Sequence, residues 1–227
     1  MSQIAEEHFG EREAESYDRK RSKLSVMKDA IYFVMNAAQD VLPASSNILC
    51  VGAGTGTEII KMAAAHPNWR FEVVEPASAM MSQCKQNIDK AGFSERCTFH
   101  EGYVSSLPED AVFDGATSIL VSHFLMDRQE RTQFFRDIYL RLVPGGHLFS
   151  VDIVSDMSAP GFETLSEMWF SETKKAGLPS DPAAFGRDVS VLPAEAVSEL
   201  LSEAGFDRPT VVLQLLLLHA FVSHKPS

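Results

Sequence analysis

Apolar residues recur at spacings of three and four between residues 24 and 38, within a stretch from residue 2 to residue 40 whose pattern is helical. This spacing predicts an amphipathic helix that packs on a sheet. The next apolar stretch, residues 48–51, is a continuous run that ends at a group of glycines, which is typical of a buried strand entering a tight turn. Apolar runs and amphipathic stretches then alternate, and this alternation predicts strands joined by crossover helices.

The expected elements are strands at residues 48–51, 69–74, 97–101, 114–121 and 147–153, and helices at residues 58–65, 78–91, 128–142 and 193–204. The PGG sequence at residues 144–146 is expected to close the helix before the fifth strand. A further helix is expected at residues 161–170, inside a long mixed segment from 155 to 191. The final apolar stretch, residues 211–222, fits one long strand or two short strands with a bend between them.

The turn after the first strand carries Gly52, Gly54 and Gly56 and leads directly into a helix. Glycine accepts positive φ and has no Cβ, so a ligand can lie against the backbone, where the helix start presents free N–H groups and its positive dipole end. Thr57 replaces the third glycine of the GxGxxG turn, so the pattern departs from that of NAD or FAD sites. Glu75 follows the second strand, where a carboxylate accepts both hydroxyls of a ribose. The two features together predict a nucleoside site.

Five motifs follow one another along the chain: ILCVGAGTG, VVEPASAM, EGYVSSLP, FDGATSILVSHFL and LVPGGHLFSVD. In this order they resemble the motif series of class I S-adenosylmethionine-dependent methyltransferases over nearly the whole chain. Within that superfamily the chain is similar to the carboxy-S-adenosylmethionine synthase group. That similarity rests on MxxC at residues 81–84, IYxxLxPGG at 138–146 and LSEAGF at 201–206. The resemblance implies a Rossmann-like, doubly wound, mostly parallel seven-stranded sheet with helices on both faces.

The resemblance also implies an N-terminal helical cap at residues 1–45 and a methyltransferase domain at residues 46–227. The segment at about 155–191 is then an insertion that builds the substrate pocket. S-adenosylmethionine would be the cofactor and S-adenosylhomocysteine the product. The cofactor-binding residues implied by the motifs are Gly52, Ala53, Gly54, Gly56, Glu75, Pro76, Met80, Gly102, Tyr103, Val104, Ser122 and Tyr17.

Two positions depart from the pattern of the family. Cys50 stands where an acid usually orders the glycine turn, and Tyr103 stands where an acid usually accepts the amino group of adenine. Met80 is expected to pack against the adenine, since a thioether fills an irregular apolar space. Tyr17 is expected near the methionyl part of the cofactor, although an ordinary helix position is an equal alternative.

His123, at the end of the fourth strand, is the candidate catalytic residue. The family presents residues there to the transferable methyl group, and an imidazole suits a general base. A structural or cofactor-lining histidine is the alternative. No GxSxG motif or carboxylate pair is present, and none is needed, because methyl transfer from a sulfonium depends mainly on alignment. The candidate substrate-pocket residues, which equally suit local packing, are Trp169, Phe170, Phe185 and Arg187.

Three functions remain open from the sequence. The first is in-line methyl transfer to a small molecule. The second is a carboxy-S-adenosylmethionine synthase of the tRNA wobble uridine pathway, which needs a cation near the methyl group; Arg187 is the candidate, because a guanidinium binds a carboxylate through two hydrogen bonds. The third is a non-catalytic protein that binds S-adenosylmethionine, which the departures at Cys50 and Tyr103 keep in consideration.

Composition narrows the class of partner. The chain has 227 residues, 45% of them hydrophobic, a net charge of −11 and a pI of about 5.1, so its overall field repels nucleic acids. Three cysteines lack metal or disulfide spacing, no signal peptide pattern is present, and the longest apolar run is too short to cross a membrane. We therefore expect a cytoplasmic protein without a metal site; the subgroup resemblance suggests a homodimer.

Overall fold

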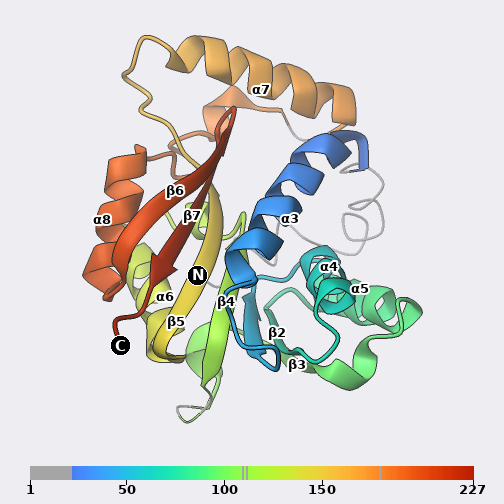
Figure 1. Cartoon of the computed structure of the whole chain (residues 1–227). Coiled ribbons are helices and arrows are strands. Elements are labelled where there is room, and N and C mark those ends of the chain that lie inside the picture. Colours follow the sequence, from blue (N-terminus) through green and yellow to red (C-terminus); the bar gives the residue numbers. More distant parts are fainter. Residues whose placement is uncertain (1–21, 109, 111, 179) are drawn as a thin grey trace.

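The computed structural model describes residues 22–108, 110, 112–178 and 180–227. Within this part of the chain, seven strands form one sheet in the order β3-β2-β1-β4-β5-β7-β6 (Figure 1). The strands are β1 (Asn47–Val51), β2 (Arg70–Glu75), β3 (Cys97–Glu101), β4 (Phe113–Ile119), β5 (Leu142–Ile153), β6 (Asp207–Leu215) and β7 (Leu218–His224). The α-helices are α3 (Ser25–Gln39), α4 (Thr57–Ala65), α5 (Ser78–Lys90), α6 (Arg128–Leu140), α7 (Phe162–Ala176) and α8 (Ala194–Ala204).

The sheet is mixed, which corrects the expectation of a mostly parallel one. Strands β3, β2, β1, β4 and β5 pair in parallel, but β7 is antiparallel to both β5 and β6. The cause is the short connection between β6 and β7. Only Leu216 and Leu217 separate these strands, and such a tight hairpin joins antiparallel neighbours. Leu216 has φ 55°, a backbone conformation that this turn imposes on a leucine.

The PGG sequence lies inside β5 and does not close α6, which ends earlier, at Leu140. The pairing of β5 with β4 shifts register between Phe113 and Gly115, and this irregularity accommodates the proline. Gly145 has φ 79°, and its N–H donates to the carbonyl of Lys225, 3.0 Å away. The chain terminus therefore supports the start of β5.

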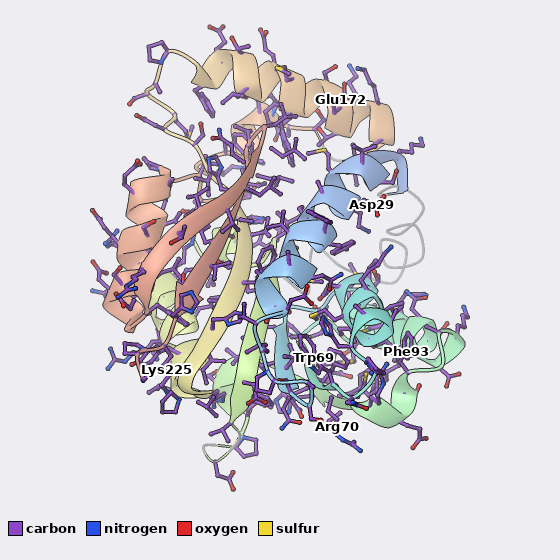
Figure 2. The ribbon with its side chains drawn as sticks, viewed as in Figure 1. Asp29, Trp69, Arg70, Phe93, Glu172 and Lys225 are labelled. Carbon is purple, nitrogen blue, oxygen red and sulfur yellow. The ribbon has the colours of Figure 1, made fainter. Side chains whose placement is uncertain are left out.

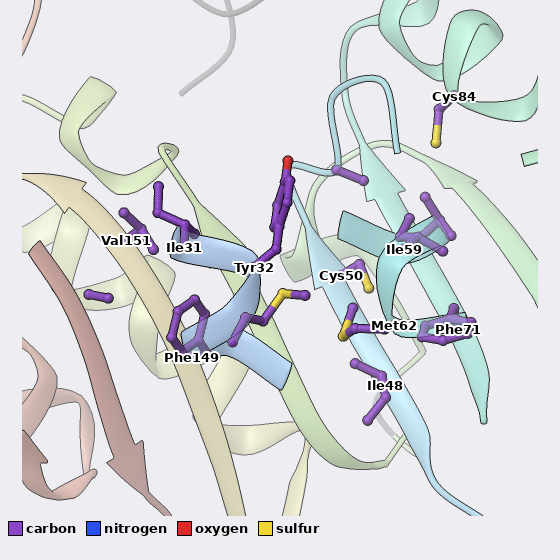
Figure 3. Packing of buried hydrophobic residues seen from close by; sticks show 14 of the residues in the cluster. Ile31, Tyr32, Ile48, Cys50, Ile59, Met62, Phe71, Cys84, Phe149 and Val151 are labelled. Carbon is purple, nitrogen blue, oxygen red and sulfur yellow. The ribbon is translucent and has the colours of Figure 1, made fainter. Parts of the chain in front are cut away.

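Helices cover both faces of the sheet, as expected for a doubly wound fold. On one face, α3, α4 and α5 bury Tyr32, Met62 and Cys84 in one apolar cluster (Figure 3). On the other face, α6 and α8 bury Phe135 and Leu200. Helix α7 comes after β5 in the chain and lies across one end of the sheet (Figure 1). It contacts the short 3-10 helix Ser22–Leu24. Residues 1–21 of the predicted N-terminal cap are outside the described residues.

Arg96 connects the end of α4 to the carbonyl of Trp69 and the ring of Phe93; Figure 2 labels these two residues. Its guanidinium donates to the carbonyl of Ala63 at 2.6 Å and to that of His66 at 2.8 Å. A cation at this place satisfies carbonyls that the end of a helix leaves unpaired. Arg96 thus stabilises the end of the sheet opposite the candidate site.

His147 gives the fold a predicted dependence on pH. Its side chain is buried, and burial, with a smaller contribution from His224, lowers its pKa to about 4. The unfolded chain therefore binds a proton below about pH 6.5 that the folded chain does not bind until about pH 4. As the pH falls through this window, we expect the free energy of unfolding to decrease by about 3 kcal/mol from this residue alone. Urea unfolding at pH 7 and pH 4.5 measures the decrease.

The test variant is His147→Gln, which should reduce the pH dependence relative to the wild type. An equal pH dependence in the wild type and His147→Gln would show that His147 is not the cause.

Candidate functional site

The glycine turn after β1 leaves one open place in the backbone. Gly52, Gly54 and Gly56 all have positive φ, of 68°, 54° and 79°. A Cβ at Gly52 would lie 2.4 Å from Val121 Cγ2, and one at Gly56 would lie 2.6 Å from Cys84 Sγ, so neither site accepts a side chain. A Cβ at Gly54 would meet nothing within 4 Å. The backbone at Gly54 is therefore the part of the turn that a ligand can approach.

Glu75, at the carboxyl end of β2, binds this turn directly. Its Oε2 accepts from the N–H of Gly54 at 2.9 Å, and its Oε1 accepts from the N–H of Ala77 at 3.0 Å. Burial raises the pKa of Glu75, and the two N–H groups oppose the rise. A carboxylate has about four acceptor positions, so two remain for other donors. The acid and the glycine turn thus face each other, as a nucleoside site requires.

Three further predicted residues lie beside Glu75. The N–H of Gly102 donates to the carbonyl of Glu75 at 3.2 Å, and Val104 is buried two residues later. Met80, near the start of α5, is 2% exposed and packs with Ala77. The Gly102–Glu75 hydrogen bond therefore joins the second and third motifs at the carboxyl ends of β2 and β3.

The segment after β4 lies against the glycine turn on its other side. Val121 occupies the space that a Cβ at Gly52 would need. Leu120 has φ 61°, an uncommon conformation for leucine, and its N–H donates to the carbonyl of Val151 at 2.7 Å. This geometry brings the 3-10 helix Ser122–Phe124 next to the carboxyl end of β5.

His123 forms a buried pair with Asp152 of β5. Its Nδ1 lies 3.1 Å from Asp152 Oδ1, and its backbone N–H donates to the same oxygen at 3.0 Å. An ionised carboxylate only accepts hydrogen bonds, so Nδ1 carries the proton and Nε2 carries the lone pair. Asp152 is not among the residues predicted from the sequence. Its signal was a lone acid in the apolar strand LFSVDIV.

Arg131 of α6 is the buried cation of this cluster, and it too was missed. Its Nε donates to Ser122 Oγ at 2.9 Å, Ser122 Oγ donates to Asp152 Oδ2 at 2.7 Å, and Nη2 forms an ion pair with Asp152 Oδ2 at 3.6 Å. Burial alone would raise the pKa of Asp152, but Arg131 and the bonds from His123 hold it below its ordinary value.

The mixed segment at residues 155–191 leaves the sheet after β5 and ends next to the point where it left. Val154 forms a parallel bridge with Leu192, and the N–H of Ser155 donates to the carbonyl of Leu192 at 3.0 Å. The N–H of Ser190 donates to the carbonyl of His123 at 2.7 Å. The segment is therefore attached both to β5 and to the candidate base.

The four predicted pocket residues separate into two groups. Phe170 and Phe185 are in ring contact, with centroids 5.0 Å apart, and Trp169 packs against the core beside them. Arg187 instead has 58% of its side chain exposed and forms ion pairs with Asp181 and Asp188, at 3.1 and 2.6 Å. Its charge is thus already matched by two carboxylates.

Other predicted contacts stay predictions. Tyr17 lies outside the described residues. The hydroxyl of Ser122 is engaged by Asp152 and Arg131, so it serves the buried cluster whether or not it also reaches a cofactor. Within the described ranges, no three His, Cys, Asp or Glu side chains are grouped to hold a metal ion.

Residues 48–146 match the model of a family described as a methyltransferase domain. By this match, residues 48–146 carry a methyltransferase domain, and the match covers less than half of the chain. The matched region contains the glycine turn, Glu75, Met80 and His123. Within it, the open backbone at Gly54 lies beside the remaining acceptor positions of Glu75.

Solved structures similar to this methyltransferase share its fold at low identity. An O-methyltransferase family protein of Burkholderia thailandensis has 13% identity and a TM-score of 0.67, with 94% of this chain and 60% of that chain covered. An O-methyltransferase family 2 protein of Planctomyces limnophilus, in complex with apigenin, has 18% identity and a TM-score of 0.63, with 83% and 56% covered. This chain thus spans little more than half of their lengths.

An N-methyltransferase of Bradyrhizobium japonicum, in complex with S-adenosylhomocysteine, is similar over 88% of this methyltransferase and 87% of its own chain, with 16% identity and a TM-score of 0.61. No curated protein matches the chain by sequence. Among the helices that the structure describes, none is long and apolar enough to cross a membrane.

Proposed function

We propose that this methyltransferase transfers a methyl group from S-adenosylmethionine to a hydroxyl group of a small molecule by in-line displacement, with His123 as the general base. The observation that carries the proposal is the buried His123–Asp152 pair. His123 lies two residues after Val121, which packs against the glycine turn. The pair fixes the tautomer of His123 so that Nε2 is its acceptor nitrogen.

The base favours oxygen as the acceptor atom. When bound, S-adenosylmethionine supplies an electrophilic methyl group, whose bonding electron pair remains on sulfur. A neutral amine can attack without help and lose its proton afterwards. A hydroxyl oxygen becomes a strongly acidic oxonium as it attacks, so a base that takes the proton to Nε2 during the attack contributes about 10²- to 10⁴-fold in rate. Two of the similar structures are described as O-methyltransferase family proteins, which supports the same choice.

For the cofactor, we assign the ribose hydroxyls to Glu75 and the amino-acid tail to the turn at Gly54. Both groups would then approach polar atoms that the structure holds in place. The remaining residues assigned to this site line the space around them: Gly52, Ala53, Gly56, Pro76, Met80, Gly102, Tyr103 and Val104.

The acceptor is assigned to the side of the domain formed by residues 155–191, where Trp169, Phe170 and Phe185 supply aromatic surface. The division into a cap at residues 1–45 and a catalytic domain at residues 46–227 is part of the same proposal. A small acceptor agrees with the net charge of −11, which repels nucleic acids.

The carboxy-S-adenosylmethionine synthase alternative gains no support at its one named residue. It needs a cation that binds a carboxylate, and Arg187 is paired with Asp181 and Asp188. A purely binding function leaves the buried His123–Asp152 pair without a purpose beyond structure. We therefore favour the transfer reaction.

The cofactor assignment predicts a selective effect of Gly54→Ala. Positive φ costs an alanine roughly 1–2 kcal/mol, and the added methyl group would project into the space assigned to the cofactor. We expect a modest loss of thermal stability and a loss of S-adenosylmethionine affinity of about tenfold or more, measured by titration calorimetry.

Gly92→Ala is the matched control. Gly92 also has positive φ, of 78°, and open space around its Cα, but it lies just past the end of α5. This variant should lose similar stability and keep its affinity. Equal affinities for wild type, Gly54→Ala and Gly92→Ala would refute the cofactor assignment.

The choice of acceptor is tested with His123→Gln on a panel of simple phenols and amines, measured by release of S-adenosylhomocysteine. We expect the wild type to methylate hydroxyl members, and the variant to lose about 10²- to 10⁴-fold in kcat while binding the cofactor normally. Methylation of amines alone, at a rate that His123→Gln does not change, would contradict the proposal.

A further inference from the structure

Arg131 belongs to the same buried cluster as the proposed base. It is 1% exposed on α6, and its guanidinium donates through Nε to Ser122 Oγ at 2.9 Å and through Nη1 to the Ser190 carbonyl at 3.2 Å. Its remaining nitrogen, Nη2, has no hydrogen-bond partner and is 3.6 Å from Asp152 Oδ2. Because Nη2 interacts with Asp152 through charge alone, Arg131 acts as a counter-ion of this carboxylate.

The net charge of the cluster determines where its protons reside. Asp152 is fully buried, and a dry site strongly disfavours an uncompensated charge. With Arg131 present, an ionised Asp152, a charged guanidinium and a neutral His123 sum to zero. Without Arg131, neutrality requires that the His123–Asp152 pair take up one proton, on either residue. An imidazolium or a protonated carboxyl would each remove the base that the proposed reaction uses.

The other groups around Asp152 do not supply this charge. Ser122 and Ser190 are neutral hydroxyls. His219 is the register partner of Asp152 on β7, and burial lowers its pKa, so it is uncharged at neutral pH. Glu195, which acts on His219, bears a carboxyl group and so supplies no positive charge. In the described part of the chain, the one cation paired with Asp152 is therefore Arg131.

We propose that Arg131 is a positioning residue: it neutralises Asp152 and so keeps His123 unprotonated at Nε2 at neutral pH. The use of Nε2 as the base rests on the proposed function, whereas the protonation state does not. The arrangement differs from a simple histidine–carboxylate pair. The carboxylate orients the imidazole through Nδ1, while the guanidinium prevents the carboxylate from drawing a second proton onto the ring.

The test follows the imidazole by ¹⁵N NMR in the ¹⁵N-labelled full chain without cofactor, with His123 assigned by comparison with His123→Gln. At pH 7.5 we expect the neutral ring with its proton on Nδ1. In Arg131→Gln the midpoint at which the pair takes up a proton should rise by roughly one to two pH units. Arg131→Lys, which keeps the charge, should stay close to the wild type.

Ser190→Ala is the structural control, because it removes the contact of Nη1 with Ser190 Oγ at 3.3 Å without changing charge. Its midpoint should equal that of the wild type. An unchanged midpoint in Arg131→Gln overturns the proposal. So does an imidazolium in the wild type at pH 7.5, and that measurement decides the matter even if Arg131→Gln does not fold. Absence of thermal stabilisation by S-adenosylmethionine would instead refute the proposed function, so the two failures are distinguishable.

Discussion

Replacing Glu75 with alanine weakens S-adenosylmethionine binding by about 100-fold. Two effects combine in this expected result. The carboxylate would lose its hydrogen bonds to the ribose, and a hydrogen bond to a charged group contributes about 1.5–3 kcal/mol. The N–H of Gly54 would also lose its acceptor, so the turn that receives the amino-acid tail would be less ordered. Titration calorimetry on the full chain measures the affinity.

Two further variants sharpen this prediction. Glu75→Gln keeps the shape of the side chain but not its charge, so we expect an intermediate loss of affinity. Glu72→Gln changes a partly buried glutamate on the same strand, away from its carboxyl end, and should leave the affinity unchanged. Wild-type affinity in Glu75→Ala would show that the ribose is bound elsewhere.

Arg131→Met should lower the stability of the fold more than any surface substitution. Removing one partner of a buried ion pair leaves an uncompensated charge, which costs about 3–5 kcal/mol. For a chain of this length, the melting temperature should fall by on the order of 10 °C. Differential scanning calorimetry measures the change.

The double variant Arg131→Met/Asp152→Asn separates the charge from the packing. With both charges removed, no unpaired ion remains, and the amide keeps a donor and an acceptor for Ser122 and His123. We expect it to recover at least half of the lost stability. Losses that simply add in the double variant would mean that the two residues do not interact.

Local patterns predicted the elements that local chemistry determines. The strand at Cys97–Glu101 has the predicted bounds and is followed by Gly102, and α5 begins at Ser78 as predicted, shortly after Pro76. The hairpin after Pro209 was left open, since Leu216 and Leu217 form a turn without the asparagine or glycine that normally marks one. Its antiparallel strand is what makes the sheet mixed.

The candidate site also has residues that local patterns predict and residues that they do not. The glycine turn and Glu75 follow from short motifs, each read at the end of a strand. Asp152 and Arg131 do not, because their meaning comes from a contact between β5 and α6 that no local spacing reveals. A lone acid in an apolar strand signals only that some partner exists.

The bridge between Val154 and Leu192 bears on how this protein could acquire new substrates. The intervening chain departs from the sheet and rejoins it at adjacent points, so its length and sequence can change without moving either anchor. The imidazole and its counter-ion belong to parts outside that loop, and the loop contacts them through Ser190, next to the point where it rejoins the sheet. The loop that is proposed to contact the acceptor can therefore change, in evolution or by engineering, while His123, Asp152 and Arg131 stay in place.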